Sequence, residues 1–143
     1  MKRQLSAAAV ALVGAATLTV SAMAAVPPGT YKGHLYNGAT KLASAPGTVT
    51  VVGAKVTIKV AKFPIKCQGP TGKFDQLSAP MKYEFKGTLK GNVVSGNYIS
   101  PLGGTGEYFT AKLTYAAATK SFTGKLGFVG KCQGTSTLKA KKA

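Results

Sequence analysis

The chain has few of the side chains that carry most enzyme chemistry. Its 143 residues include one histidine, three carboxylates and no tryptophan. A Ser-His-Asp triad would have to use His34 and Asp75, because each is the single residue of its type, and no G-x-S-x-G motif accompanies them. A glycosidase needs two carboxylates at a set separation, and Glu84 and Glu107 are the remaining acids. We therefore expect a protein that is not an enzyme, with no catalytic residue and no cofactor.

Arginine is also nearly absent, although the chain is strongly basic. The formal net charge is +16 at pH 7, and Arg3 is the single arginine. Lysine is a strongly hydrated point charge, whereas the planar fork that suits specific phosphate or base recognition belongs to arginine. The charge therefore predicts loose attraction to anionic polymers or cell-envelope surfaces, and no specific recognition of nucleic acid.

The first 24 residues follow the order of a secretory signal peptide. Met1-Lys2-Arg3 precedes a nearly uncharged run from Leu5 to Val20, and Ala22-Met23-Ala24 is an A-x-A cleavage site. Serine and threonine interrupt the run, which argues against a membrane anchor of about 20 apolar residues. We expect a signal peptide over 1–24 and one domain over 25–143, secreted into the extracellular space or periplasm or associated with the cell wall. Cleavage leaves 17 lysines against three carboxylates, a net charge of +14.

The two cysteines lie in two copies of one motif, F-x-x-K-C-Q-G, at Phe63–Gly69 and Phe128–Gly134. An oxidising compartment and an even number of thiols favour a disulfide between Cys67 and Cys132. A metal site would need further ligands, and only His34 is available, so we expect none. The repeat is compatible with an internal duplication and with convergence of two similar hairpins. We interpret it as a structural clamp between the two halves of the chain.

Apolar and polar residues alternate with period two along most of the chain after residue 28, and no stretch sustains the 3.6-residue period of a helix. Together with many glycine and proline turns, this pattern predicts an all-β fold: an antiparallel barrel or sandwich of about 8–9 strands, mostly hairpin-connected, with one disulfide. The missing tryptophan argues against an immunoglobulin-type sandwich. The predicted inward residues are Tyr31, Leu35, Val56, Ile58, Val60, Met81, Tyr83, Phe85, Val94, Gly96, Tyr98, Phe109, Ala111, Leu113, Tyr115, Phe122, Leu126 and Phe128.

Several irregularities interrupt this alternation. The parity changes after Val60, which predicts a bulge near Ala61 or Lys62. We expect loops at 45–47 and 69–78, and a frayed basic tail at 141–143. Glycines at inward positions, Gly33 and Gly124 among them, would either leave room for a ligand or permit tight packing of a filled core.

Two outward tyrosines share a face with lysines. Tyr36 accompanies Lys32, and Tyr108 accompanies Lys112. If their strands lay close together, these four residues would form a shallow cationic and aromatic patch, which makes them the candidate surface binding site.

Four short segments resemble small exported β proteins of actinobacteria. They are Gly29-Thr-Tyr-Lys-Gly, Phe122-Thr-Gly-Lys, Lys131-Cys-Gln-Gly-Thr and Leu138-Lys-Ala-Lys-Lys. The resemblance implies export and an all-β fold, and it brings no activity, cofactor or catalytic residue. The leading hypothesis is an exported non-enzymatic β protein that associates electrostatically with anionic polymers or surfaces. The alternative is a small-ligand carrier or inhibitor that uses a barrel cavity or a loop.

Overall fold

The computed structural model describes residues 25–99 and 106–143, so the predicted signal peptide lies outside the described residues. The described residues form ten β-strands and no helix, and accordingly none that is long and apolar enough to cross a membrane. The strands are β1 (Gly29–Asn37), β2 (Thr40–Val52), β3 (Lys55–Phe63), β4 (Lys66–Gln68), β5 (Phe74–Leu77), β6 (Met81–Lys90), β7 (Val93–Tyr98), β8 (Tyr108–Ala116), β9 (Ser121–Val129) and β10 (Cys132–Lys142).

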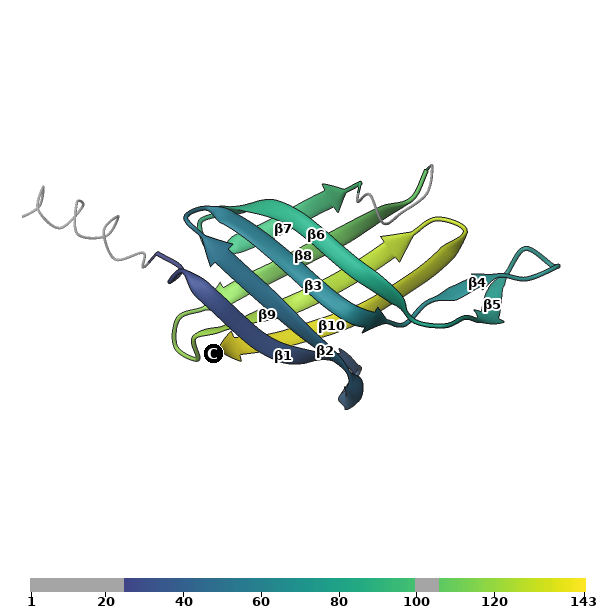
Figure 1. The fold of residues 1–143 in the computed structure, drawn as a ribbon, viewed down its shortest axis with the longest axis horizontal. Coiled ribbons are helices and arrows are strands. Elements are labelled where there is room, and N and C mark those ends of the chain that lie inside the picture. Colours follow the sequence, from purple (N-terminus) through teal and green to yellow (C-terminus); the bar gives the residue numbers. More distant parts are fainter. Residues whose placement is uncertain (1–24, 100–105) are drawn as a thin grey trace, which may run out of the picture.

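Eight of these strands form a closed antiparallel barrel (Figure 1). The pairing order is β1-β2-β3-β6-β7-β8-β9-β10, and β1 pairs with β10 to complete the ring. Neighbours in the ring follow one another along the chain, except that the β4–β5 hairpin is inserted between β3 and β6. The hairpin projects from one end of the barrel. The all-β prediction is confirmed, and the architecture is an up-and-down barrel rather than a sandwich.

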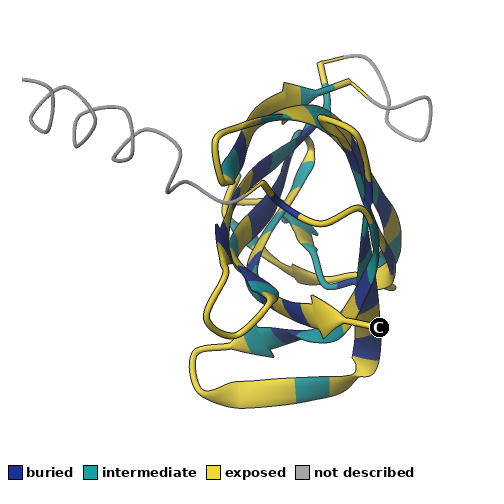
Figure 2. Cartoon of the chain, turned by 90° about the vertical axis from the view of Figure 1, so that its left-hand side faces the viewer, coloured by how far each residue is buried: buried dark blue, intermediate teal, exposed yellow. Residues whose placement is uncertain are grey.

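The period-two pattern explains which residues fill the barrel. On β3, Val56, Ile58 and Val60 are buried while Lys55 and Lys59 are exposed. Figure 2 shows buried and exposed positions alternating along the strands of the ring. The inward predictions hold for most strands, with Met81 and Tyr98 only partly buried and Gly96 exposed. Gly96 lies opposite the buried Ala111, as its inward prediction requires, yet it is itself exposed. Its φ of 140° is a backbone conformation that few other residues adopt.

Aromatic rings pack together at the end of the barrel that carries the hairpin. Successive ring centroids lie 5.0, 4.9 and 5.0 Å apart along a chain of four rings: Phe63, Tyr83, Phe109 and Phe128. The Tyr83 hydroxyl donates a hydrogen bond to the Thr110 carbonyl oxygen, which satisfies the single polar group of the cluster. Burial raises the pKa of Tyr83 well above its usual range.

A second aromatic cluster fills the opposite end. The Tyr31 ring lies 4.9 Å from Phe122 and 5.9 Å from Tyr115, both edge to face. Its hydroxyl donates a hydrogen bond of 2.7 Å to the Pro27 carbonyl oxygen. Burial, followed by the nearby Tyr115 phenol, raises the pKa of Tyr31 to about 12. The two clusters close the barrel from both ends.

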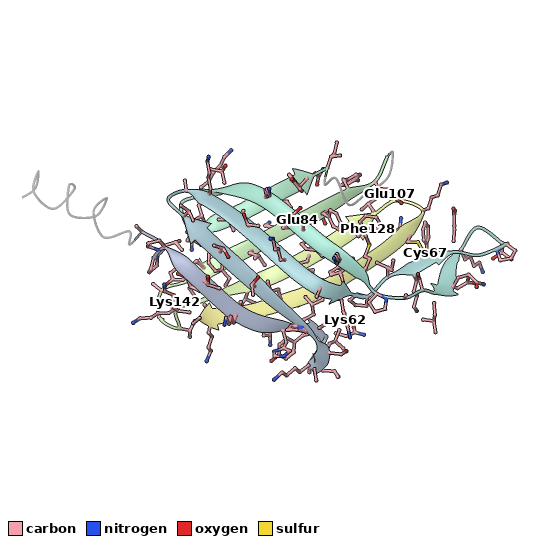
Figure 3. The ribbon with its side chains drawn as sticks, in the orientation of Figure 1. Lys62, Cys67, Glu84, Glu107, Phe128 and Lys142 are labelled. Carbon is pink, nitrogen blue, oxygen red and sulfur yellow. A yellow bond between two sulfur atoms is a disulfide. The ribbon has the colours of Figure 1, made fainter. Side chains whose placement is uncertain are left out.

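The twin motif forms a nearly symmetric clamp beside the first cluster. Cys67 pairs with Cys132 in an antiparallel ladder and is bonded to it by the predicted disulfide. Lys66 lies opposite Gln133, and the Gln68 amide donates to the Lys131 carbonyl oxygen at 3.1 Å. The two K-C-Q triplets therefore lie opposite each other in antiparallel order, as a structural clamp between the two halves of the chain would require. Figure 3 shows Cys67 at the base of the hairpin.

Three predicted irregularities differ from the structure. The predicted loop at 45–47 is part of β2, where Pro46 lies opposite His34 just before the register shifts. The predicted loop at 69–78 contains β5, which pairs with β4. The basic tail is not frayed, because Lys142 pairs with Tyr31 and the Ala143 amide donates to the Thr30 carbonyl oxygen. The bulge, by contrast, is confirmed by a register shift between Val60 and Phe63.

Candidate anion-binding surface

The four residues of the predicted patch lie on two strands that are not neighbours. Lys32 and Tyr36 are on β1, Tyr108 and Lys112 are on β8, and β9 and β10 lie between them. Only Tyr36 and Lys112 belong to the same row across the sheet, through Thr137 and Lys125. Tyr108 lies four residues before Lys112 on β8, opposite Val129. The structure therefore does not gather the four residues into one compact patch.

Further lysines, which the patch prediction did not include, lie on the strands between these four residues. Lys32 lies directly opposite Lys141, and Lys112 lies directly opposite Lys125. Like charges placed directly across a strand pair destabilise a sheet, by roughly 0.2–1 kcal/mol per pair. The sequences of β1, β8, β9 and β10 contain no carboxylate that would offset them. We call the outward side of these four strands the lysine face.

The opposite side of the barrel is also rich in lysine but is arranged differently. Across β3 and β6, Lys59 lies opposite Glu84, Lys55 opposite Thr88 and Lys86 opposite Thr57. Glu84 is labelled on β6 in Figure 3, with Lys142 at the far end of β10. Each of these three lysines faces an acid or a threonine, while Lys62 and Lys82 lie at the register shift between Val60 and Phe63. The lysine face differs in that two of its lysine pairs, Lys32 with Lys141 and Lys112 with Lys125, are in regular register.

An open groove of about 560 Å³ runs over β1, β10 and the beginning of β9. Besides Gly33 and Ala140, its lining residues are basic, aromatic or hydroxylated, and no carboxylate lines it: Lys32, His34, Tyr36, Lys41, Thr119, Ser121, Thr123, Lys139 and Lys141. The Lys139 ammonium lies 4.5 Å from the centroid of the Tyr36 ring, a cation–π contact. We call this depression the β1–β10 groove.

Sequence reasoning identified Lys32 and Tyr36 in the groove but missed Lys139 and Lys141. The sequence did contain a signal for these two lysines, because Lys139 and Lys141 alternate with the apolar residues Leu138 and Ala140. The structure shows both apolar residues to be buried. Lys141 was assigned to a frayed tail instead. Its position opposite Lys32 depends on closure of the barrel by residues more than 100 positions apart, which no local pattern reveals.

The interior of the barrel gives no support to a ligand cavity. The seven rings of the two aromatic clusters occupy its ends, and the inward glycines mark close contacts between strands. A Cβ on Gly33 would overlap the Lys139 carbonyl oxygen, and one on Gly124 would overlap that of Lys112. These glycines therefore permit tight packing, and the pockets that the described residues form include sites on the outside of the barrel.

One such external site is an apolar cleft between the hairpin and the barrel. It measures about 460 Å³, and its apolar side chains include Leu42, Ile65, Phe74 and Leu77. Leu77 is 85% exposed. The disulfide fixes the hairpin wall of this cleft to β10.

The residues considered for catalysis lie apart. His34 is in the β1–β10 groove, while Asp75 is on the projecting strand β5. His34 pairs with Lys139, seven residues along β10 from the Cys132 that holds the hairpin, a distance of roughly 24 Å at about 3.4 Å per residue. Within residues 25–99 and 106–143, no three histidine, cysteine or acidic side chains come together as metal ligands would.

Comparison of the chain with protein families, with curated proteins and with solved structures gives no match.

Proposed function

We propose that this protein is an exported, non-enzymatic β protein that binds anionic polymers or cell-envelope surfaces through its lysine face. The observation that carries the proposal is the direct opposition of Lys32 with Lys141 and of Lys112 with Lys125. Such pairs destabilise the isolated sheet. A bound polyanion would place negative charge between the opposed ammonium groups and convert this repulsion into attraction.

The charge of the chain supports the same conclusion at longer range. After removal of residues 1–24 the net charge is +14, and a field of this sign speeds the encounter with polyanions. The interaction is lysine-based, so it favours charge density over a defined sequence of groups. Export is supported by the signal-peptide pattern and is compatible with the disulfide between Cys67 and Cys132.

The test is chromatography of the mature protein, residues 25–143, on a sulfated polysaccharide and on a neutral one of the same backbone. We expect retention on the sulfated matrix alone, with elution between low and physiological salt because counterions compete for the lysines. Elution in the void volume at low salt would overturn the proposal.

Two variants of equal net charge locate the binding surface. Lys32→Gln/Lys125→Gln/Lys141→Gln neutralises three lysines of the lysine face, and Lys55→Gln/Lys86→Gln/Lys90→Gln neutralises three on β3 and β6. We expect the first to elute at clearly lower salt than the second. Elution of both at the same salt concentration would show that net charge alone governs binding.

A further inference from the structure

We propose that the β1–β10 groove is a binding site for an anionic saccharide, so that the polymer recognised by the lysine face is an acidic glycan. This inference rests on the proposed function and makes it more specific. It follows from three kinds of group that the groove combines: ammonium groups, an aromatic ring and hydroxyls.

The ammonium groups provide the site for the acidic substituent. Lys32 and Lys141 lie opposite each other on neighbouring strands, where paired Cα atoms are about 5 Å apart. Lys139 extends over the groove from the same strand as Lys141, and Lys41 adds a fourth positive charge from β2. A sulfate or carboxylate between these side chains would accept charge-assisted hydrogen bonds from more than one lysine.

The aromatic ring provides a surface that a purely ionic site would not need. Tyr36 is half-buried, and the Lys139 ammonium lies 4.5 Å from its centroid. This contact holds the ring and the ammonium next to each other, one flat and apolar, the other charged. A sugar ring with an acidic substituent presents the complementary arrangement, an apolar ring face beside a negative charge.

The hydroxyl groups supply hydrogen-bond acceptors as well as donors. Lysine only donates, whereas serine and threonine do both. Ser121 lies opposite Lys141 and Thr123 opposite Lys139 on the neighbouring strand β9, and the Thr119 and Ser121 hydroxyl oxygens are 2.6 Å apart. The hydroxyls of a sugar both donate and accept, whereas an ionised phosphate chain only accepts. The mixture therefore matches a saccharide better than inorganic polyphosphate.

The size of the groove is compatible with a short saccharide segment. Its volume of about 560 Å³ lies within the range of small-molecule sites, roughly 300–1,000 Å³. The groove is an open depression rather than an enclosed cavity, so the site does not require a free oligosaccharide. The β1–β10 groove would thus bind the saccharide as one segment of a polymer.

The test compares two probes by titration calorimetry: a sulfated hexasaccharide and inorganic polyphosphate of similar charge. The variant is Tyr36→Leu, which removes the ring but keeps an apolar side chain, and the matched control is Tyr108→Leu on β8, outside the groove. Thr123→Ala serves as a second variant, because Thr123 is exposed and its loss leaves the core intact. Thermal melts confirm that each variant is folded.

We expect Tyr36→Leu to weaken hexasaccharide binding about two- to tenfold, as the loss of an aromatic contact does. Polyphosphate binding should stay the same, and Tyr108→Leu should change neither affinity. Thr123→Ala should weaken the hexasaccharide alone. Equal affinity of both groove variants and the wild type for the hexasaccharide, or an equal loss for both probes, would overturn the saccharide site and leave the proposed function standing. Binding of neither probe by the wild type would overturn both.

Discussion

Reversing the charge of one lysine on the lysine face should raise stability and lower binding at the same time. Lys141 is the clearest position, because it lies directly opposite Lys32. Replacing Lys141 by glutamate converts a repulsive cross-strand pair into an attractive one. The same substitution removes a positive charge from the proposed binding surface and adds a negative one.

The magnitude follows from the spacing of the pair. Unit charges separated by the Cα spacing of the pair, about 5 Å, interact by about 0.8 kcal/mol in water, and measured cross-strand pairs contribute roughly 0.2–1 kcal/mol. We therefore expect Lys141→Glu to raise the free energy of unfolding by about 0.5–1 kcal/mol. For a domain of this size that corresponds to an increase of about 2–5 °C in Tm.

A double-mutant cycle isolates the contribution of the pair from the general charge of the barrel. It comprises the wild type, Lys32→Glu, Lys141→Glu and the double variant, unfolded by denaturant at low and at high salt. The double variant restores a like-charge pair, so its gain in stability should be smaller than the sum of the two single gains. At about 1 M salt the Debye length falls to about 3 Å, and the coupling should nearly vanish.

Two results would refute this reasoning. Additive stability gains at low salt would show that Lys32 and Lys141 do not interact. A single variant that gains stability but is retained on the sulfated polysaccharide as strongly as the wild type would separate the repulsive pair from binding. In that case the opposed lysines would be a structural accident.

Three further predictions concern the barrel itself. Replacing Cys67 and Cys132 by alanine should lower the free energy of unfolding by about 4 kcal/mol in the chain-entropy account, given the sequence separation of 65 residues; a loss below about 1 kcal/mol in denaturant titration would show that the clamp contributes little. Gly124→Ala should destabilise the barrel strongly, because its Cβ would overlap a carbonyl oxygen of β8; an unchanged Tm would contradict the close approach. The raised pKa values of Tyr31, to about 12, and of Tyr83 mean that the folded barrel favours the neutral phenols. Stability should hold below about pH 10 and fall as the pH rises toward 12; a Tm that is constant across this range would be inconsistent with burial of the phenols.

The parts of the fold that depend on local pattern were predictable from the sequence. Val56, Ile58 and Val60 alternate with polar residues, and the change of parity after Val60 marks the bulge that the structure contains. The disulfide followed from the count of cysteines and the expected compartment. These predictions need only the geometry of one strand and the chemistry of one residue type.

Other features depend on closure of the ring and were missed for that reason. Pro46 and its flanking residues read as a loop, yet they pair with β1 up to a shift in register. The lysines at 141 and 142 read as a tail, yet β1 supplies them with a partner strand. Local turn and tail signals are outweighed by the hydrogen bonds that closure of the barrel supplies, because every strand of the ring has a partner on both sides.

The candidate site shows the same division. That Tyr36 and Lys32 point outward was predictable, because alternation along β1 places them on the face opposite Tyr31 and Leu35. Their neighbours were not, because the order of strands in a barrel and their register are set by the whole chain. The β1–β10 groove therefore replaces the predicted pairing of β1 with β8 as the candidate site.

The most direct test of the lysine face is a map of backbone amide shifts by nuclear magnetic resonance during titration with a sulfated hexasaccharide. The account predicts that the shifted amides concentrate in β1, β9, β10 and the adjoining part of β8, with the largest changes near Tyr36 and Lys139. Shifts that concentrate on β3 and β6, or that spread evenly around the barrel, would contradict it.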